Sequence, residues 1–400
     1  MTSSSAFQTE ITGVLAATQN FATKGSLLLR LIRAAQPITR TEIAERLKID
    51  KSTVTENVKP LIASGILCEK TVNTDGRRGR LLSYAAEDSY FIGVNLGVRR
   101  SQVGVTTLWG EIEDENDFET PSDPAVALRK AREQIAKIIH DKSGRLPNVI
   151  GVSVPGMTDT HRRKLVFAPN LNWRDIDIAD ALNVDDKIRI VVENDSTVAA
   201  MYEARVRIGK SDGGIMTNFI LVRSGTGIGV GLVIGSEVYR GTGVGRGIAG
   251  EFGHMTIVAG GKQCVCGNRG CWEKYASAAS AASLYLGDRP PARGESVPKF
   301  VEIVARAVNG DNRSRKTLEK VGDYLGIGIA NVIMGVGIPR VIISGRLVYG
   351  WRFIEEPLIA AVNRSIVGQI DGWSVEAGEP VGSAIGGALE VAVEEYLSTV

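Results

Sequence analysis

The chain has 400 residues, of which 44% are apolar, and a formal net charge of +2, which is the composition of a globular protein with room for two or three domains. Its N-terminus is rich in Ser and Thr and has no basic stretch before an apolar one, so we expect no signal peptide. The most apolar region, residues 325–344, is interrupted by Asn331, Pro339 and Arg340. It therefore predicts a buried helix and a buried strand and excludes a membrane span.

Charge is distributed unevenly along the chain. Residues 20–85 carry twelve Lys/Arg and six Asp/Glu, whereas the remainder carries 35 and 39. A basic N-terminal module on a mildly acidic body indicates a nucleic-acid partner for the module alone. We therefore expect a flexible segment over residues 1–20, a DNA-binding module over 21–86 and a larger body over 87–400.

Three helices are predicted in the N-terminal module. Apolar residues recur at helical spacing within residues 21–35. Thr39 and Glu42 form the pattern of a capping box, which predicts the start of a second helix. Asp50 is expected to cap a third helix with Val54 on its buried side. Pro60 predicts that this third helix bends or ends early.

The third helix and the hairpin after it have the composition of a DNA-contacting surface. At 100° per residue, short polar side chains lie opposite the buried side of the helix, where they suit base edges and phosphates. Strands are expected over residues 67–72 and 81–84, with Asp75-Gly76 as the hairpin turn and arginines beside it. A winged helix-turn-helix is therefore predicted, and a basic protein–protein module is the alternative. The predicted DNA-binding residues are Ser52, Thr53, Glu56, Lys59, Arg77, Arg78 and Arg80.

The body contains two similar stretches. Residues 91–112 and 218–239 each predict a meander of three strands with glycine turns, and each is followed by alternating helices and strands. This repeat is typical of the duplicated ribonuclease H-like α/β fold of actin and the sugar kinases, with a cleft between two lobes. The expected lobes are approximately residues 87–193 together with the C-terminal helix, and residues 194–380.

Three of the four cysteines lie close to one histidine. Three thiolates and one imidazole form the closed ligand set of a structural zinc site, and glycines between them allow a tight loop. Glu251 and Glu273 bracket this loop, so a bound metal would fix the positions of two carboxylates. The alternative is three buried thiols near an unrelated histidine. The predicted metal ligands are His254, Cys264, Cys266 and Cys271.

The run Glu251-x-Gly253-His254, followed by C-x-C-G-x-x-G-C-x-E, closely resembles the signature of the ROK family of repressors and sugar kinases. The resemblance extends over about residues 88–400. It implies one structural Zn²⁺ per chain on the four ligands above and a two-lobed α/β body. Winged modules precede the sensor domain in ROK repressors, so the resemblance agrees with the predicted DNA-binding module.

The resemblance also implies a sugar site. Carboxylates and an amide supply the hydrogen-bond acceptors that vicinal hydroxyls need. His254 would face the metal with one ring nitrogen and the sugar with the other. For Asn194 and Asp195 the alternative is a helix cap, which both residue types favour. Asn170 and Trp173 match a nearby loop of the family. The predicted sugar-binding residues are Gly156, Asn194, Asp195, Glu251, His254 and Glu273.

Phosphate chemistry separates the two functional classes of the family. In ROK kinases the first turn reads D-x-G-x-T, whereas this chain has Asn95-Leu96-Gly97-Val98-Arg99, although the second turn, residues 224–229, is kinase-like. We therefore expect a regulator without kinase activity, most simply a repressor responsive to a sugar or a sugar phosphate. Free thiols indicate a reducing compartment, the cytoplasm.

The expected partner of such a regulator is double-stranded operator DNA, bound by a homodimer or a dimer of dimers. One alternative is a ROK-type ATP-dependent sugar kinase with a fused DNA-binding domain. The other is a regulator whose effector is a second protein.

Overall fold

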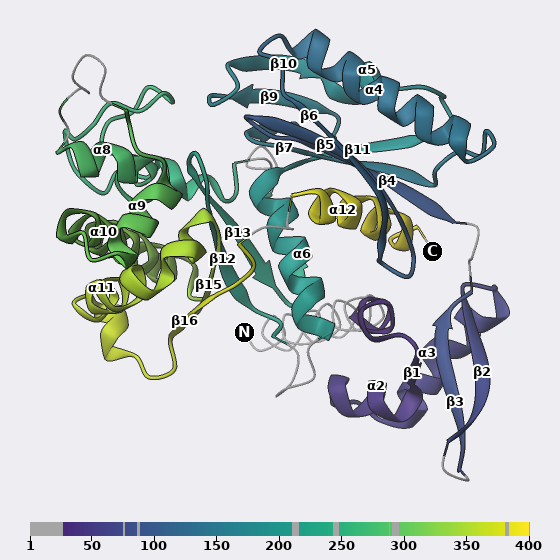
Figure 1. Cartoon of the computed structure of the whole chain (residues 1–400). Helices are drawn as coiled ribbons and strands as arrows, with labels where there is room; N and C mark the ends of the chain where they lie inside the picture. Colours follow the sequence, from purple (N-terminus) through teal and green to yellow (C-terminus); the bar gives the residue numbers. More distant parts are fainter. Residues whose placement is uncertain are drawn as a thin grey trace, which may run out of the picture.

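The structure, a computed structural model, describes residues 27–74, 77–85, 89–209, 216–242, 248–287, 289, 296–380 and 384–399. The side chains of residues 72–74 and 77–79 are not described. The expected flexible segment 1–20 and the predicted hairpin turn Asp75-Gly76 lie outside the described residues. Figure 1 shows the N-terminal module beside a two-lobed body, with the C-terminal helix between the two lobes.

The N-terminal module is a winged helix-turn-helix. Residues 27–35 are helical, and α2 (Arg40–Leu47) and α3 (Lys51–Ala63) follow. The wing is a three-stranded sheet in the order β1-β3-β2, built from β1 (Ile38–Thr39), β2 (Leu67–Thr74) and β3 (Arg77–Tyr84). The predicted capping box is confirmed, because the amide of Glu42 donates to Thr39 Oγ1 at 3.1 Å and the amide of Thr39 donates to Glu42 Oε2 at 2.8 Å.

Three details of this module differ from the sequence expectation. Asp50 takes the N-cap position of α3 but makes no capping hydrogen bond with its side chain. Pro60 does not end α3, which continues to Ala63; a proline removes only its own amide bond, and the buried Val54 and Val58 hold this helix against its neighbours. The second wing strand begins at Arg77, so the arginines belong to the strand pair and not to the loop.

The body contains two five-stranded sheets with one topology. Their orders are β11-β7-β4-β5-β6 and β14-β13-β12-β15-β16. In each sheet three consecutive strands form an antiparallel meander. Two later strands are added on the side of the first meander strand and run parallel to it. This repetition confirms the duplicated ribonuclease H-like architecture. The first sheet consists of β4 (Tyr90–Leu96), β5 (Arg100–Thr107), β6 (Ile112–Glu119), β7 (Val149–Val154) and β11 (Arg189–Asn194). The second consists of β12 (Phe219–Ser224), β13 (Ile228–Ile234), β14 (Glu237–Val238), β15 (Arg340–Gly345) and β16 (Ser374–Ala377).

Shorter elements and helices complete the two lobes. A small sheet in the order β10-β9-β8 extends the first lobe, and the strongly apolar region predicted as helix then strand is α10 followed by β15. The first lobe has β8 (Met157–Thr158), β9 (Lys164–Ala168), β10 (Trp173–Asp177), α4 (Pro124–Asp141) and α5 (Ile178–Leu182). The second has α7 (Glu273–Ala276), α8 (Ser280–Leu286), α9 (Phe300–Val308), α10 (Asn312–Val336) and α11 (Trp351–Asn363).

Two helices lie between the lobes. Helix α6 (Asp195–Gly209) begins at the end of β11 and packs on β13 of the other sheet, while α12 (Ile385–Leu397) packs on β4, β7 and α6. Figure 1 shows both helices at the centre of the molecule, with the winged module at the far end of α6. In the part of the chain that the structure describes, no helix is long and apolar enough to cross a membrane.

Candidate functional site

A cavity of about 460 Å³ lies between the lobes, at the ends of β4, β7, β11, β12 and β15. Ligands of open α/β sheets bind at this edge. All six predicted sugar-binding residues line the cavity: Gly156, Asn194, Asp195, Glu251, His254 and Glu273. Asn170 also lines it, whereas Trp173 is buried in the core of the first lobe, where its Nε1 donates to the carbonyl of Ser122 at 2.9 Å.

Asn194 both caps a helix and faces the cleft. Its Oδ1 accepts hydrogen bonds from the amides of Ser196 at 2.8 Å and Thr197 at 3.3 Å, which caps α6. Its Nδ2 donates to the carbonyl of Gly156 at 2.9 Å and to Glu251 Oε1 at 3.4 Å. Asn194 can therefore be both a helix cap and a sugar-binding residue, because the capping hydrogen bonds fix the direction of its amide group inside the cleft.

Three carboxylates gather on one side of the cavity. Burial, followed by the nearby charges of Asp195 and Glu273, raises the pKa of Glu251 to about 7. With a pKa of about 7, the Glu251 carboxyl group can both donate and accept hydrogen bonds near neutral pH. Asp195 Oδ2 forms an ion pair with Arg223 at 2.7 Å. Gly227 makes room for Glu273, since a Cβ at that position would lie 2.3 Å from Glu273 Oε2.

The predicted metal ligands converge. Their ligand atoms all lie within 4.8 Å of one another. The sulfurs of Cys266 and Cys271 are 3.7 Å apart, and Cys264 Sγ lies 3.6 Å from His254 Nδ1. A tetrahedral zinc ion with ordinary bond lengths requires about 3.8 Å between two sulfurs and about 3.6 Å between sulfur and nitrogen. The donor set therefore fits Zn²⁺ in chemistry and in spacing.

The other ring nitrogen of His254 faces the cleft. Its Nε2 lies 3.7 Å from Glu251 Oε2, while its Nδ1 is turned toward the cysteines. Gly270 closes the cysteine loop at φ +78°, where a Cβ would lie 1.8 Å from the carbonyl of Val258. The imidazole thus joins the cysteine cluster to the carboxylates of the cavity.

The predicted DNA-binding residues of α3 lie on its outer side. Ser52, Glu56 and Lys59 are exposed and Thr53 is half-buried, opposite the buried valines of the same helix. On the wing, Arg80 is exposed and its Nη1 lies 3.4 Å from Glu69. The side chains of Arg77 and Arg78 lie outside the described residues.

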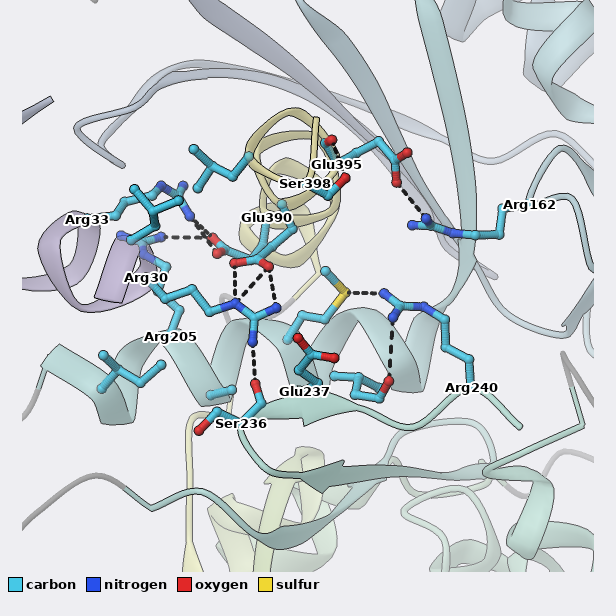
Figure 2. Close-up of a pocket in the computed structure, with 17 residues that line it drawn as sticks. Arg30, Arg33, Arg162, Arg205, Ser236, Glu237, Arg240, Glu390, Glu395 and Ser398 are labelled. Atoms are coloured by element: carbon cyan, nitrogen blue, oxygen red, sulfur yellow. Dashed lines mark hydrogen bonds and ion pairs between the residues drawn. The ribbon is translucent and has the colours of Figure 1, made fainter. Parts of the chain in front are cut away.

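A second cavity, of about 430 Å³, separates the winged module from the body (Figure 2). It lies among helix 27–35, α6 and α12, and two ion pairs cross from the module to the body. Arg33 Nη1 lies 2.5 Å from Glu390, and Arg30 Nη2 lies 2.6 Å from Glu394. We call these two ion pairs the interdomain pairs. Sequence reasoning missed them, because no local pattern connects residues more than 350 positions apart.

Two arginines that line this second cavity, Arg162 and Arg240, also contact the strand that carries the cleft residues. Glu193, directly before Asn194 on β11, is buried, and its Oε1 lies 2.6 Å from Arg240 and 2.7 Å from Arg162. Arg162 in turn pairs with Glu395 of α12 at 2.5 Å (Figure 2). Of two consecutive residues of β11, Asn194 thus lines the interlobe cleft and Glu193 pairs with arginines that line the second cavity.

Comparison with known proteins identifies the class to which this fold and cleft belong. The ROK family profile matches residues 91–392, and a winged helix-turn-helix DNA-binding profile matches residues 26–67. The chain therefore belongs to the ROK family and carries an N-terminal winged helix-turn-helix.

Its relatives include both regulators and enzymes. The chain is 30% identical to the xylose repressor of Bacillus spizizenii, over 86% of this chain and 87% of the relative. It is 28% identical to a glucokinase of Streptomyces coelicolor, over 69% of this chain and 88% of the relative. The fold is shared with a ROK family transcriptional regulator, a homologue of the E. coli MLC protein, at a TM-score of 0.72 and 20% identity, with 94% of this chain and 97% of that chain covered.

Proposed function

We propose that this protein is a sugar-responsive transcriptional repressor whose ligand binds in the interlobe cleft and weakens DNA binding by the winged module. The observation that carries the proposal is the position of α6. This helix of 15 residues starts at Asp195 in the cleft and ends at Gly209, where a Cβ would lie 3.1 Å from the carbonyl of Ala34 in helix 27–35. One helix of about 22 Å therefore spans the distance from the candidate sugar site to the DNA-binding module.

The cleft has the chemistry of a polyhydroxyl site. Carboxylates of Asp195, Glu251 and Glu273 and the amide of Asn194 point into one partly buried cavity. Each sugar hydroxyl that finds a partner there replaces a water hydrogen bond, whereas an unmatched hydroxyl is penalised. The His254–cysteine cluster supports this site, and a bound Zn²⁺ would supply a rigid structural link between His254 and the loop that ends at Glu273.

A ligand that closes the cleft changes the relative position of the two lobes. Helix α6 contacts strands of both five-stranded sheets, and the interdomain pairs connect α12 to helix 27–35. A movement of one lobe relative to the other is therefore transmitted to the winged module. The ligand acts only through its different affinity for the two arrangements, which is a population shift. A homodimer is part of the proposal. One winged module makes few base contacts, and a dimer doubles them by binding two half-sites of the operator DNA.

Sugar phosphorylation is not part of the proposed function. The end of β4 has Asn95, and the turn after it has Arg99, where the kinase pattern has Asp and Thr, and Asn95 Nδ2 donates to Gln102 at 3.0 Å. Asp195, which by resemblance matches the catalytic base of the ROK kinases, forms an ion pair with Arg223. The glucokinase relative is the observation in favour of the alternative, an ATP-dependent sugar kinase fused to a DNA-binding domain.

The experiment follows DNA binding and turnover on the same protein. A labelled duplex is selected from a random-sequence pool with the purified full-length chain, and its release is followed by fluorescence anisotropy while monosaccharides and their phosphate esters are added. We expect one of them to release the duplex. A parallel incubation with ATP, Mg²⁺ and the sugars should consume no ATP beyond the sugar-free control; sugar-dependent consumption would favour the kinase alternative.

A further inference from the structure

The second cavity, between the winged module and the body, is separate from the interlobe cleft. Its volume of about 430 Å³ is close to that of the cleft, and no residue lines both cavities. Figure 2 shows labelled side chains from helix 27–35, α6 and α12 around it. Cavities of this size at domain interfaces commonly hold small molecules. The proposed sugar response places no ligand here, so the chemistry of this cavity needs its own explanation.

The charges around the second cavity do not cancel. Five arginines and four glutamates line it, which leaves an excess of one positive charge among the described residues. Glu193 and Arg189 pair with lining residues from outside the cavity, and because they carry opposite charges they leave this excess unchanged. A second negative charge on a ligand would be repelled by the glutamates without a matching cation. The cavity therefore favours a monoanion.

Two of these arginines share one carboxylate. Glu390 lies 2.5 Å from Arg33 and 3.6 Å from Arg205. Burial lowers the pKa of Arg205 below its ordinary value, and the positive charge of Arg33 adds to this effect while the charge of Glu390 opposes it. A second carboxylate beside Arg33 and Arg205 would complete the neutralisation that Glu390 alone leaves incomplete.

Two buried polar atoms on the wall of this cavity have no hydrogen-bond partner within the described ranges. They are Nε of Arg33 and Oγ of Ser236, and the two residues are 4% and 3% exposed. Buried polar groups in proteins are nearly always hydrogen-bonded. The guanidinium N–H requires an acceptor, whereas the serine hydroxyl can pair with another hydroxyl. Together these atoms indicate a ligand that carries a carboxylate and at least one hydroxyl group.

We propose that the second cavity binds a small hydroxycarboxylate, with its carboxylate on Arg33 and Arg205 and a hydroxyl on Ser236. Guanidinium groups bind carboxylates through charge-assisted hydrogen bonds. The carbon chain of the ligand would pack on Ile208 and Val238, which also line the cavity. Such a ligand would contact both the winged module and the body, so this second site goes beyond the proposed sugar response in the cleft.

Calorimetry with the full-length chain tests the chemical class of the ligand. The probes are gluconate and lactate, together with hexanoate and propionate, which have the same carbon counts without hydroxyls, and inorganic phosphate. We expect gluconate or lactate to bind at one site per chain, at least fivefold more tightly than its hydroxyl-free counterpart and than phosphate. The proposal is wrong if neither hydroxycarboxylate binds, or if the counterpart or phosphate binds equally well.

Two substitutions test the contacts without leaving a buried charge unpaired. Arg205→Gln removes one cation while Glu390 keeps Arg33 as its partner, and Ser236→Ala removes a hydroxyl that has no partner among the described residues. Each should weaken hydroxycarboxylate binding at least fivefold, and Ser236→Ala should leave the affinity for the hydroxyl-free probe within twofold. Thermal unfolding checks that both variants fold. Arg129→Gln, an exposed position on α4, is the control and should bind like the wild type.

A third variant decides which cavity the hydroxycarboxylate occupies. Glu251→Ala changes the interlobe cleft and no residue of the second cavity, so the affinity for the hydroxycarboxylate should stay within twofold of the wild-type value. Weaker binding in Glu251→Ala, or unchanged binding in Arg205→Gln or Ser236→Ala, would overturn the second site. The sugar response is measured with neutral sugars and DNA, so it can hold or fail independently of this result.

Discussion

Arg33 and Glu390 form an ion pair in which both side chains are almost completely removed from solvent, with 2% and 3% of their surface exposed. Arg33 belongs to the first described helix of the winged module and Glu390 to α12 at the other end of the chain. Arg205 of α6 lies 3.6 Å from the same carboxylate. The buried charges of Arg33, Glu390 and Arg205 therefore connect the DNA-binding module to the body, so a movement of α12 or α6 is expected to move the module as well.

Breaking this pair should uncouple DNA binding from the ligand. Arg33→Met leaves Glu390 buried with one weaker partner, which costs about 3–5 kcal/mol of local stability. The ratio of the DNA dissociation constants with and without ligand should fall at least fivefold, as measured by anisotropy. The double variant Arg33→Met/Glu390→Met should lose less thermal stability than Arg33→Met, because the buried Glu390 carboxylate that lost its main partner is also removed, while Arg205 keeps its hydrogen bond to the carbonyl of Gly110.

The control for this prediction is Arg129→Met on the outer helix α4, where the side chain is exposed. It should leave both stability and coupling unchanged. An undiminished ligand response in Arg33→Met would show that the interdomain pairs carry no signal.

Glu251→Ala should separate ligand sensing from DNA binding. Glu251 contacts Asn194 at 3.4 Å in the cleft and has no contact with the winged module among the described residues. We expect DNA affinity to stay within about twofold and the ligand to bind at least tenfold more weakly, since a buried, charge-assisted hydrogen bond is lost. Calorimetry and anisotropy measure the two effects. Glu133→Ala on α4 is the control, and normal release of DNA by the ligand in Glu251→Ala would contradict the cleft site.

Removal of the metal should disturb the same cleft. Cys271→Ser replaces a buried ligand, so the variant should contain less than the one zinc per chain expected of the wild type and should melt at a lower temperature. The affinity of this variant for the ligand should fall, because the bound metal would no longer fix the positions of His254 and Glu273. Cys68→Ser, in the wing and outside the cluster, is the matched control. Elemental analysis and thermal unfolding are the measurements, and a zinc-free wild type with full ligand affinity would refute the structural role.

The wing should contribute to DNA affinity through charge. Arg78→Ala removes one predicted phosphate contact, so affinity should fall for all sequences and the slope of log K against log salt should decrease by about 1. Lys137→Ala on α4 gives a charge-matched control. A slope equal to that of the wild type would place Arg78 outside the DNA interface.

Features encoded in short segments could be predicted from the sequence. The capping box at Thr39 and Glu42 and the three cysteines within eight residues depend on chain neighbours, so their spacing determines their geometry. The repeated meander also follows from local strand and turn patterns. How far α3 continues beyond Pro60 could not be decided from local propensity, because tertiary packing of Val54 and Val58 also holds this helix, which ends at Ala63.

Features assembled from distant segments could not be predicted. The interlobe cleft combines the ends of β4, β12 and β15, which only the fold brings to one cavity. The interdomain pairs join helix 27–35 to α12, and a basic residue on an amphipathic helix gives no sign of the carboxylate it will meet. Trp173, expected near the sugar loop by resemblance, instead packs in the core, where burial of its large ring outweighs a place in the cleft.

The central claim is that occupation of the interlobe cleft controls DNA binding. The most direct test titrates the tightest-binding monosaccharide or monosaccharide ester into the preformed protein–DNA complex and measures the DNA dissociation constant at ligand saturation. We predict that it rises at least tenfold for the wild type and less than twofold for Glu251→Ala. An unchanged constant for the wild type, with calorimetry showing the cleft saturated, would contradict the account.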